Sequence, residues 1–238
     1  MVYFYSFMDS EKIIPNCIGV IVDGNRRWAK ERGLPTLEGH RTGFNKLQDL
    51  IDWAHEAGVK NVVAYVFSTE NWNRAPEEVN YLMDLFRQQV KFVTEKFHKK
   101  NYKVRVIGLL SKLAPDLQEL IKEAEEKTKF NTGILVTLAL SYGGRDEISS
   151  AVNSLLTDQN RPSEITPEVF EKYLWSNHIP DIDMVIRTSG EHRLSNFMTW
   201  KSVYSELFFP EVKFPGLTKE IFYELLEEFS NRHRRFGK

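Results

Sequence analysis

The sequence predicts a single α/β domain with a central, mostly parallel sheet flanked by helices. Short apolar runs rich in Val, Ile and Leu alternate along the chain with longer segments of helical periodicity, a pattern that is typical of strand–helix–strand units. Several runs are apolar on consecutive residues, which indicates strands that are covered on both faces. No internal repeat, low-complexity tract or Gly/Ser linker divides the chain. We therefore expect one domain over residues 15–238, preceded by an N-terminal extension over residues 1–14.

The elements of this domain follow one another in order along the chain. Five apolar runs are predicted as strands: residues 17–22, 61–67, 102–109, 134–141 and 183–187. Six segments are predicted as helices: residues 39–57, 76–99, 114–128, 145–156, 166–175 and 218–233. Thr218 is a good N-cap for the last helix, and Glu220 places a negative charge in its first turn.

The composition is that of an ordinary soluble protein, with 42% hydrophobic and 27% charged residues among 238. The formal net charge is −1 and there is no long basic block, so nothing favours general nucleic-acid binding. The single cysteine, Cys17, cannot form an internal disulfide, and its apolar neighbours favour a buried thiol in a reducing compartment. No run reaches the roughly 18–20 apolar residues of a membrane span. We expect a cytoplasmic protein.

Polar residues follow the predicted strands at their carboxyl ends, where parallel α/β sheets bind ligands. The first such cluster is residues 23–28, with the sequence Asp-Gly-Asn-Arg-Arg-Trp. Asp23 is placed to hold Mg²⁺, and Gly24 lets the backbone approach a ligand closely. Backbone amides at the following helix start, with Arg26 and Arg27, favour a diphosphate. The alternative is an ordinary turn with solvated arginines, and the glycine and lysine spacing of a Walker A loop is absent.

Comparable clusters follow the other strands. Residues 68–74 bring hydroxyl, carboxylate, amide, indole and guanidinium groups together, and residues 187–197 carry two arginines and three hydroxyl residues, a good diphosphate cradle. The alternative for residues 68–74 is an ordinary polar loop, and the alternative for residues 187–197 is a salt-bridged surface loop. The turn at residues 141–145 is by itself weak evidence for a binding site. Glu206 is a second carboxylate that we expect to return to this site. His40 adds a titratable group, although a single histidine is more often structural.

In this order, the clusters closely resemble those of the cis-prenyltransferase family, whose bacterial members include undecaprenyl diphosphate synthase. The resemblance covers nearly the whole chain, from about residue 18 to residue 237. It implies a Mg²⁺-dependent enzyme that condenses isopentenyl diphosphate with an allylic diphosphate, farnesyl or geranylgeranyl diphosphate. The implied product is a long-chain cis-polyprenyl diphosphate such as undecaprenyl diphosphate. A short- or medium-chain cis-prenyl diphosphate synthase is the alternative within the family.

The resemblance also implies roles for single residues. Asp23 would engage Mg²⁺ and the leaving diphosphate, with Glu206 as the second magnesium-associated carboxylate. Asn71 is the family's candidate for assisting proton removal, but a neutral amide is a poor base and a diphosphate oxygen is the alternative. Around the allylic diphosphate would lie Gly24, Asn25, Arg26, Arg27, Trp28 and His40. The loop over the reacting centre would contain Ser68, Thr69, Glu70, Trp72 and Arg74, and isopentenyl diphosphate would be held by Arg187, Arg193, Leu194 and Ser195.

Further expectations concern assembly and the growing chain. Residues 235–237, Arg-Phe-Gly, match the Arg-x-Gly ending that homodimers of the family use to complete the partner's active site, so we expect a homodimer. Release of a lipid product implies peripheral contact with the membrane. The lengthening chain needs an enclosed hydrophobic tunnel, and core packing is the alternative role for each residue of the predicted wall. That wall is a helical stripe of Leu82, Leu85, Phe86, Val90 and Phe97.

Three positions depart from the family pattern. Arg26 stands where bacterial members often have glycine, and Thr36 where many have another phosphate-facing arginine. Residues 214–216, Phe-Pro-Gly, replace the more usual Trp-Pro-Asp or Trp-Pro-Glu. None of these removes a catalytic position, but they leave substrate preference and product length open.

Two other classes of protein compete with the enzyme. A non-catalytic subunit would stabilise a prenyltransferase partner, but such subunits lose the Asp-Gly-Asn cluster that is intact at residues 23–25. A nucleotide-binding α/β protein is the second, but the sequence has no matching Gly-rich dinucleotide fingerprint.

Overall fold

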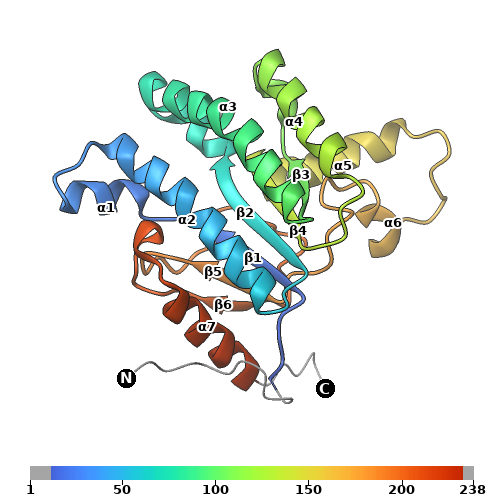
Figure 1. Ribbon diagram of the computed structural model, residues 1–238. Coiled ribbons are helices and arrows are strands. Elements are labelled where there is room, and N and C mark those ends of the chain that lie inside the picture. Colours follow the sequence, from blue (N-terminus) through green and yellow to red (C-terminus); the bar gives the residue numbers. More distant parts are fainter. Residues whose placement is uncertain (1–11, 233–238) are drawn as a thin grey trace.

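The computed structural model describes residues 12–232 (Figure 1). Most of the expected N-terminal extension, residues 1–11, lies outside this range. The predicted Arg-Phe-Gly tail, residues 235–237, lies outside it as well. Within the range, no helix is both long enough and apolar enough to cross a lipid bilayer.

The sheet has six strands in the order β3-β4-β2-β1-β5-β6, and every neighbouring pair is parallel. The strands are β1 Cys17–Ile21, β2 Asn61–Ser68, β3 Lys103–Ile107, β4 Leu135–Tyr142, β5 Met184–Arg187 and β6 Glu206–Phe208. The α/β prediction and all five predicted strands are confirmed. The sequence did not predict β6, because three residues are too short a run to show a strand pattern.

Within the described range, seven α-helices connect or cover these strands. They are α1 Asn25–Glu31, α2 Thr36–Glu56, α3 Pro76–Lys99, α4 Pro115–Thr128, α5 Gly144–Thr157, α6 Pro167–Glu171 and α7 Lys219–Asn231. Proline at the first helical position starts α3, α4 and α6, where its missing N–H costs no hydrogen bond. The predicted cap of α7 is confirmed, since Thr218 Oγ1 accepts the amide of Ile221 at 3.4 Å. Helix α6 ends at Glu171, short of the predicted residue 175.

Alternate residues of the central strands face opposite sides of the sheet, which explains their continuous apolar runs. Ile18 and Val20 of β1 pack toward the side that carries α2 and α7 (Figure 1). Cys17 and Ile21 face the other side, where Phe197 and the segment before β5 cover them. Cys17 is fully buried, and burial raises the pKa of its thiol well above its usual value, as expected for an unreactive core residue.

Strand β1 is the point at which the connectivity changes direction. From β1 the chain moves to β2 on one side, whereas β5 pairs with β1 on the other side. Ligands of open parallel sheets bind at such switch points, beyond the carboxyl ends of the strands. The topology therefore directs attention to the residues that follow β1, β2 and β5.

Close packing of α1 on α2 holds the segment after β1 in place. A Cβ at Gly39 of α2 would collide with the backbone carbonyl oxygen of Asn25, and a Cβ at Gly43 would collide with the Asn25 side-chain oxygen. These two glycines thus let the start of α1 lie directly on α2, and they fix the position of the residues next to Asp23.

We expect Gly39→Ala to lower the free energy of unfolding by about 1–3 kcal/mol, because a backbone oxygen cannot yield as a flexible side chain does. Urea denaturation followed by tryptophan fluorescence measures this change. Gly216→Ala is the matched control, since the nearest atom to its added Cβ lies 3.5 Å away, an ordinary contact. Equal stability of the two variants would show that α1 adjusts freely on α2.

Candidate active site

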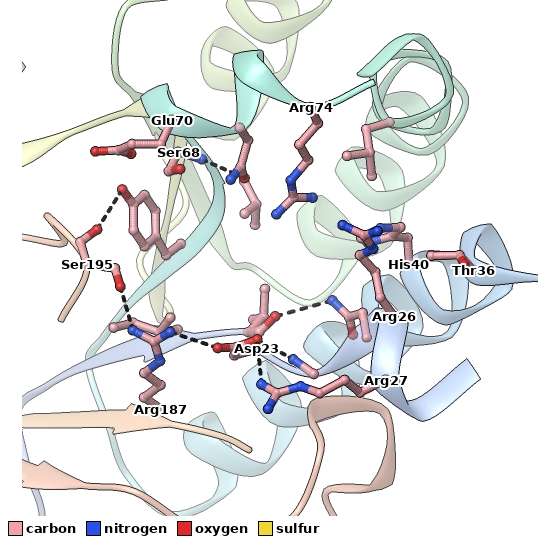
Figure 2. A pocket seen from close by; sticks show the side chains of 18 of the residues that line it. Asp23, Arg26, Arg27, Thr36, His40, Ser68, Glu70, Arg74, Arg187 and Ser195 are labelled. Atoms are coloured by element: carbon pink, nitrogen blue, oxygen red, sulfur yellow. Dashed lines mark hydrogen bonds and ion pairs between the residues drawn. The ribbon is translucent and has the colours of Figure 1, made fainter. Parts of the chain in front are cut away.

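A cavity of about 860 Å³ opens at the carboxyl ends of β1, β2 and β5 (Figure 2). It lies at the switch point of the sheet, as the topology requires. Most of the predicted site residues line it. The lining comprises Ile21, Val22, Asp23, Gly24, Asn25, Arg26, Arg27, Lys30, Thr36, His40, Tyr65, Val66, Ser68, Glu70, Asn71, Arg74, Leu82, Arg187, Ser195 and Asn196.

Asp23 is the carboxylate at the base of this cavity. Its Oδ2 accepts a hydrogen bond from Arg187 at 2.8 Å, and its Oδ1 accepts the Gly24 amide at 2.6 Å and Arg27 at 3.3 Å. Burial raises the pKa of Asp23, but Arg187, the Gly24 amide and Arg27 together outweigh burial, so the net pKa lies below its usual value. Asp23 is therefore an ionised carboxylate at neutral pH.

Arg187 is a buried guanidinium at the end of β5. In addition to Asp23, it donates through Nη1 to Ser195 Oγ at 2.7 Å and to the backbone oxygen of Arg193 at 2.6 Å. Its Nε is buried and has no partner among residues 12–232. The Arg187 side chain thus joins the carboxylate after β1 to the loop after β5. Its Nε remains as a donor without a partner among the described residues.

The turn after β1 needs glycine. Gly24 has φ of 96°, in the left-handed region, and a Cβ there would collide with Ser189 Oγ. Thr188 Oγ1 donates to the Asp23 backbone oxygen at 2.7 Å, so the loop after β5 packs tightly against this turn. The Asp-Gly pair is therefore a requirement of the local backbone as well as of the predicted chemistry.

The arginines of α1 are each held by carboxylates. Arg27 lies between Asp23 and Glu191, whose Oε1 is 2.9 Å from the guanidinium. Arg26 is 3.6 Å from Glu78, near the start of α3. These contacts fix both guanidinium groups at the cavity edge in the absence of a ligand.

Glu78 is a site residue that the sequence analysis did not assign. Its mostly buried carboxylate lies 2.9 Å from Arg74, 3.2 Å from His40 and 3.6 Å from Arg26, measured between nitrogen and oxygen. The three partners come from different parts of the chain. Burial lowers the pKa of His40 and the charges of Arg74 and Arg26 act in the same direction, whereas Glu78 raises it, and the net pKa lies below its usual value. A single carboxylate therefore organises one wall of the cavity.

Glu78→Gln keeps the shape of this side chain and removes its charge. We expect the free energy of unfolding to fall by about 1–3 kcal/mol, because buried hydrogen-bond partners lose their charged acceptor. We also expect the pKa of His40 to fall further below its usual value, since Glu78 is the group that raises it. Urea denaturation and NMR titration of the histidine rings measure both effects.

Glu119→Gln is the matched control for Glu78→Gln, because Glu119 is an exposed residue whose lysine partner is 3.9 Å away. An unchanged His40 titration in the Glu78 variant would contradict the role of Glu78 as the organising carboxylate.

The loop after β2 forms a short 3₁₀ helix, Thr69–Asn73, above the cavity. Asn71 Oδ1 accepts the Ser68 amide at 3.1 Å, which closes a capping box with the Ser68 side chain. Glu70 Oε1 accepts from Asn196 at 3.0 Å, so this loop is tied to the loop after β5. Ser68, Glu70, Asn71 and Arg74 all line the cavity, as predicted.

Five predicted substrate-binding residues do not line the cavity: Trp28, Thr69, Trp72, Arg193 and Leu194. Trp72 donates to Ser141 Oγ at 2.9 Å and packs edge-on against Phe67. These contacts attach the loop after β2 to strands β4 and β2. Thr69 donates to Asp146 at 3.0 Å. The Arg193 side chain binds Glu191 at 2.6 Å, and only its backbone oxygen contacts Arg187. In this structure these residues support the site and do not form its surface.

Glu206 does not return to the cavity within this chain. It begins β6 opposite Met184, whereas Arg187 lies three residues further along β5, or about 10 Å at the usual strand rise. Its carboxylate binds Arg232 at 3.0 Å. The strand register therefore places Glu206 away from Asp23 within this chain, and its role as a second magnesium-associated carboxylate stays a prediction.

A second, apolar cavity of about 50 Å³ lies between α2, α3, α4 and the sheet. Phe86, Val90 and Phe97 of the predicted tunnel stripe line it, Leu82 lines the first cavity, and Leu85 lines neither. Val66 borders both cavities. The apolar space lies where the tunnel was expected, but its volume corresponds to only a few water-sized spheres.

The site also contains residues that no local motif indicated. Tyr65 and Glu78 come from a strand and a helix, and their sequence neighbours carry no distinguishing pattern. Lys30 and Asn196 line the cavity and lie beside or within the predicted clusters at residues 23–28 and 187–197, so their place in the chain was the available signal. For Tyr65 the signal was the alternation of its strand, which places it on one sheet face.

A basic cavity built around one ionised carboxylate, with an apolar cavity beside it, defines a site for a diphosphate ligand that carries an apolar group. Comparison with known proteins is consistent with this class. Residues 21–237 match the family model described as putative undecaprenyl diphosphate synthase. The isoprenyl transferase of Thermotoga maritima is 44% identical over 226 residues, which cover 94% of this chain and 97% of that protein. The isoprenyl transferase of Streptococcus mutans is 43% identical, with coverage of 94% and 93%.

Two solved structures share the fold. Lavandulyl diphosphate synthase from Lavandula x intermedia, in complex with dimethylallyl diphosphate, superposes with a TM-score of 0.90 at 32% identity, covering 94% of this chain and 99% of that one. A probable undecaprenyl diphosphate synthase from Campylobacter jejuni gives 0.80 at 35% identity, with the same coverage. The chain therefore belongs to the undecaprenyl diphosphate synthase family of cis-prenyltransferases. It is an enzyme that transfers prenyl groups between isoprenoid diphosphates.

Proposed function

We propose that this cavity condenses isopentenyl diphosphate with farnesyl or geranylgeranyl diphosphate and extends the product to long chain length. The observation that carries the proposal is the pairing of ionised Asp23 with buried Arg187, with phosphate-binding side chains on both sides of the pair. Arg26 and Arg27 stand on one side of the pair, and Ser195 on the other. Such a site can hold two diphosphates at once, one to leave and one to stay.

The chemical step balances without an external oxidant or base. The allylic C–O bond breaks and its electron pair leaves with the diphosphate, and the double bond of isopentenyl diphosphate forms the new C–C bond. A proton is then lost to form the new cis alkene. Asn71 is poorly suited to take it, since its carbonyl oxygen already accepts the Ser68 amide. A diphosphate oxygen is therefore the proposed base, with Asn71 as a hydrogen-bond donor.

The residues present fit the Mg²⁺ that the family implies. Magnesium is usually held by one or two carboxylates together with substrate phosphates, and Asp23 is an ionised carboxylate on the cavity surface. No group of three or more His, Cys, Asp or Glu side chains suited to a metal occurs among residues 12–232. When bound, the ion would neutralise charge on the departing diphosphate. Glu206, whose carboxylate binds Arg232 in this chain, stays the proposed second carboxylate.

Product length is the part of the proposal for which a second possibility, a short-chain synthase, also has support. The family model and the Campylobacter jejuni structure, both described as undecaprenyl diphosphate synthase, favour a long-chain synthase. The small apolar cavity and the likeness to a lavandulyl diphosphate synthase bound to dimethylallyl diphosphate favour a short-chain one. We prefer the long chain, because the family model that is described as undecaprenyl diphosphate synthase matches residues 21–237, nearly the whole chain.

An assay of the purified protein with Mg²⁺ and isopentenyl diphosphate tests the proposal. Each reaction contains one allylic starter: dimethylallyl, geranyl, farnesyl or geranylgeranyl diphosphate. The expected result is a ladder from farnesyl or geranylgeranyl diphosphate that ends in a long cis-polyprenyl diphosphate, read by product mass and double-bond geometry. A single short product from dimethylallyl diphosphate would select the short-chain synthase. No product from any starter would reject the activity of the chain alone.

We also propose a homodimer in which residues 235–237 of one copy reach the other copy's site, and peripheral membrane contact during product release. Exposed apolar side chains on α5 and before β6, Leu156 and Val203 among them, support a protein partner. We expect Arg235→Ala to raise the KM for isopentenyl diphosphate, with the dimer retained in sedimentation velocity. An unchanged kinetic profile would make the tail a bystander.

A further inference from the structure

Five permanently cationic side chains line the cavity, and four of them already have a carboxylate partner. Arg187 pairs with Asp23 at 2.8 Å and Arg27 with Glu191 at 2.9 Å. Arg74 pairs with Glu78 at 2.9 Å, and Arg26 lies 3.6 Å from the same carboxylate. Lys30 alone has no ion pair or hydrogen bond from its side chain to any residue in the 12–232 range.

The neighbours of Lys30 do not neutralise it either. Glu31, the adjacent carboxylate on α1, is engaged by Lys213 at 2.9 Å. A cation with a fixed carboxylate must give up that partner, or share it, before it binds a phosphate. Lys30 is exposed and unpaired, so its charge is available to a ligand without such competition.

The position of Lys30 selects one of the two diphosphates. Lys30 follows Arg26 by four residues on α1, so the two side chains lie on the same helix face, and both line the cavity. Arg26, Thr36 and His40 stand together on one side of the cavity, whereas Arg187 and Ser195 stand on the other (Figure 2). Lys30 therefore belongs to the wall formed by α1 and α2.

This wall leads directly to the apolar cavity. His40 of α2 lines the first cavity, and Phe44, one helical turn later, lines the second. A ligand whose diphosphate rests against α1 and α2 can thus place a long apolar tail along α2. Isopentenyl diphosphate has only a five-carbon group and does not need this path, whereas the allylic substrate does.

We propose that Lys30 binds the terminal phosphate of the allylic diphosphate and sets the affinity of the enzyme for that substrate. A lysine ammonium is a compact charge with three donors on a flexible stem, which suits a phosphate at the exposed edge of a site. The assignment deepens the proposed function and rests on it. Thr36 brings no charge to the same wall and Arg26 shares Glu78, so Lys30 is the unpaired cation of this wall among residues 12–232.

The test compares Lys30→Gln with the native enzyme. We expect the KM for farnesyl diphosphate to rise about tenfold, the size of one charge-assisted hydrogen bond, with kcat and the KM for isopentenyl diphosphate unchanged. Calorimetric titration with the non-ionising analogue farnesyl thiolodiphosphate should show the same loss without any turnover. Lys122→Gln, an exposed lysine on α4, is the matched control and should leave all three constants unchanged.

A charge-relocation variant separates the role of the charge from local damage. Thr36→Lys in the Lys30→Gln background should restore most of the affinity, since it returns one cation to the same wall. An unchanged KM for farnesyl diphosphate in Lys30→Gln overturns the inference. So does a rise confined to isopentenyl diphosphate, which would place Lys30 at the other diphosphate. A native enzyme that forms no prenyl product overturns the proposed function, whereas native turnover with an unaffected Lys30 variant overturns this inference alone.

Discussion

Asp23→Ala is expected to lower kcat by about 10³-fold, comparable to the loss of a strong electrostatic stabiliser at the reacting centre. Asp23 is the only carboxylate that contacts the buried Arg187 among residues 12–232, and its lowered pKa keeps it ionised across the neutral range. Without it, the Mg²⁺ that the family implies would lose its carboxylate ligand beside the departing diphosphate. Steady-state kinetics at saturating concentrations of both substrates, with product mass as the readout, measure the loss.

The fold must survive for this result to be informative. Asp23→Asn retains the size of the side chain and an acceptor for the Gly24 amide, but it loses the charged acceptor of Arg187. We expect it to remain folded, with a free energy of unfolding lowered by about 1–3 kcal/mol, and to be nearly as inactive as the alanine variant. Asp49→Ala, at a half-exposed carboxylate on α2, is the control and should be fully active. Near-native turnover in a folded Asp23→Asn enzyme would remove Asp23 from the leaving-group role.

The parts of the site that follow strands were predictable from sequence because a parallel sheet brings the carboxyl ends of its strands together. Asp23, Ser68 and Arg187 each come directly after or at the end of an apolar run, and the structure places all three in one cavity. The alternation of strands and helices along the chain was enough to predict the fold class, since it leaves few other topologies.

Contacts between distant segments were not predictable. Glu78 binds His40 across 38 residues of sequence, and Arg26 is further still, so no local spacing reveals the cluster. The position of Glu206 was not predictable for a related reason. Its place depends on the register of a three-residue strand against β5, and a sequence pattern does not determine which end of a short strand faces the site.

Arg187 carries the second large expected effect, because it is the buried group that joins the two halves of the site. Arg187→Lys keeps the positive charge, but one ammonium cannot reach Asp23, Ser195 and the backbone oxygen of Arg193 as the forked guanidinium does. We expect the free energy of unfolding to fall by about 2–4 kcal/mol, since one or two buried acceptors lose their donor. We expect the KM for isopentenyl diphosphate to rise about tenfold, since lysine lacks the one guanidinium donor, Nε, that has no protein partner among residues 12–232.

The pH dependence of stability provides an independent check on the same pair. Asp23 has a lowered pKa in the folded state, so its pairing with Arg187 stabilises the protein above the unfolded pKa and is lost as pH falls through the folded pKa. Arg187→Ala removes the partner, and the pKa of the buried Asp23 carboxyl should rise. The stability deficit of this variant should therefore be larger at neutral pH than in acid, where Asp23 is protonated in both proteins. Arg87→Ala, which breaks an exposed pair with Asp116, should show only a small deficit at neutral pH. A deficit in Arg187→Ala that does not change with pH would mean that Arg187 stabilises the fold by packing alone, and that Asp23 is held ionised by its other partners.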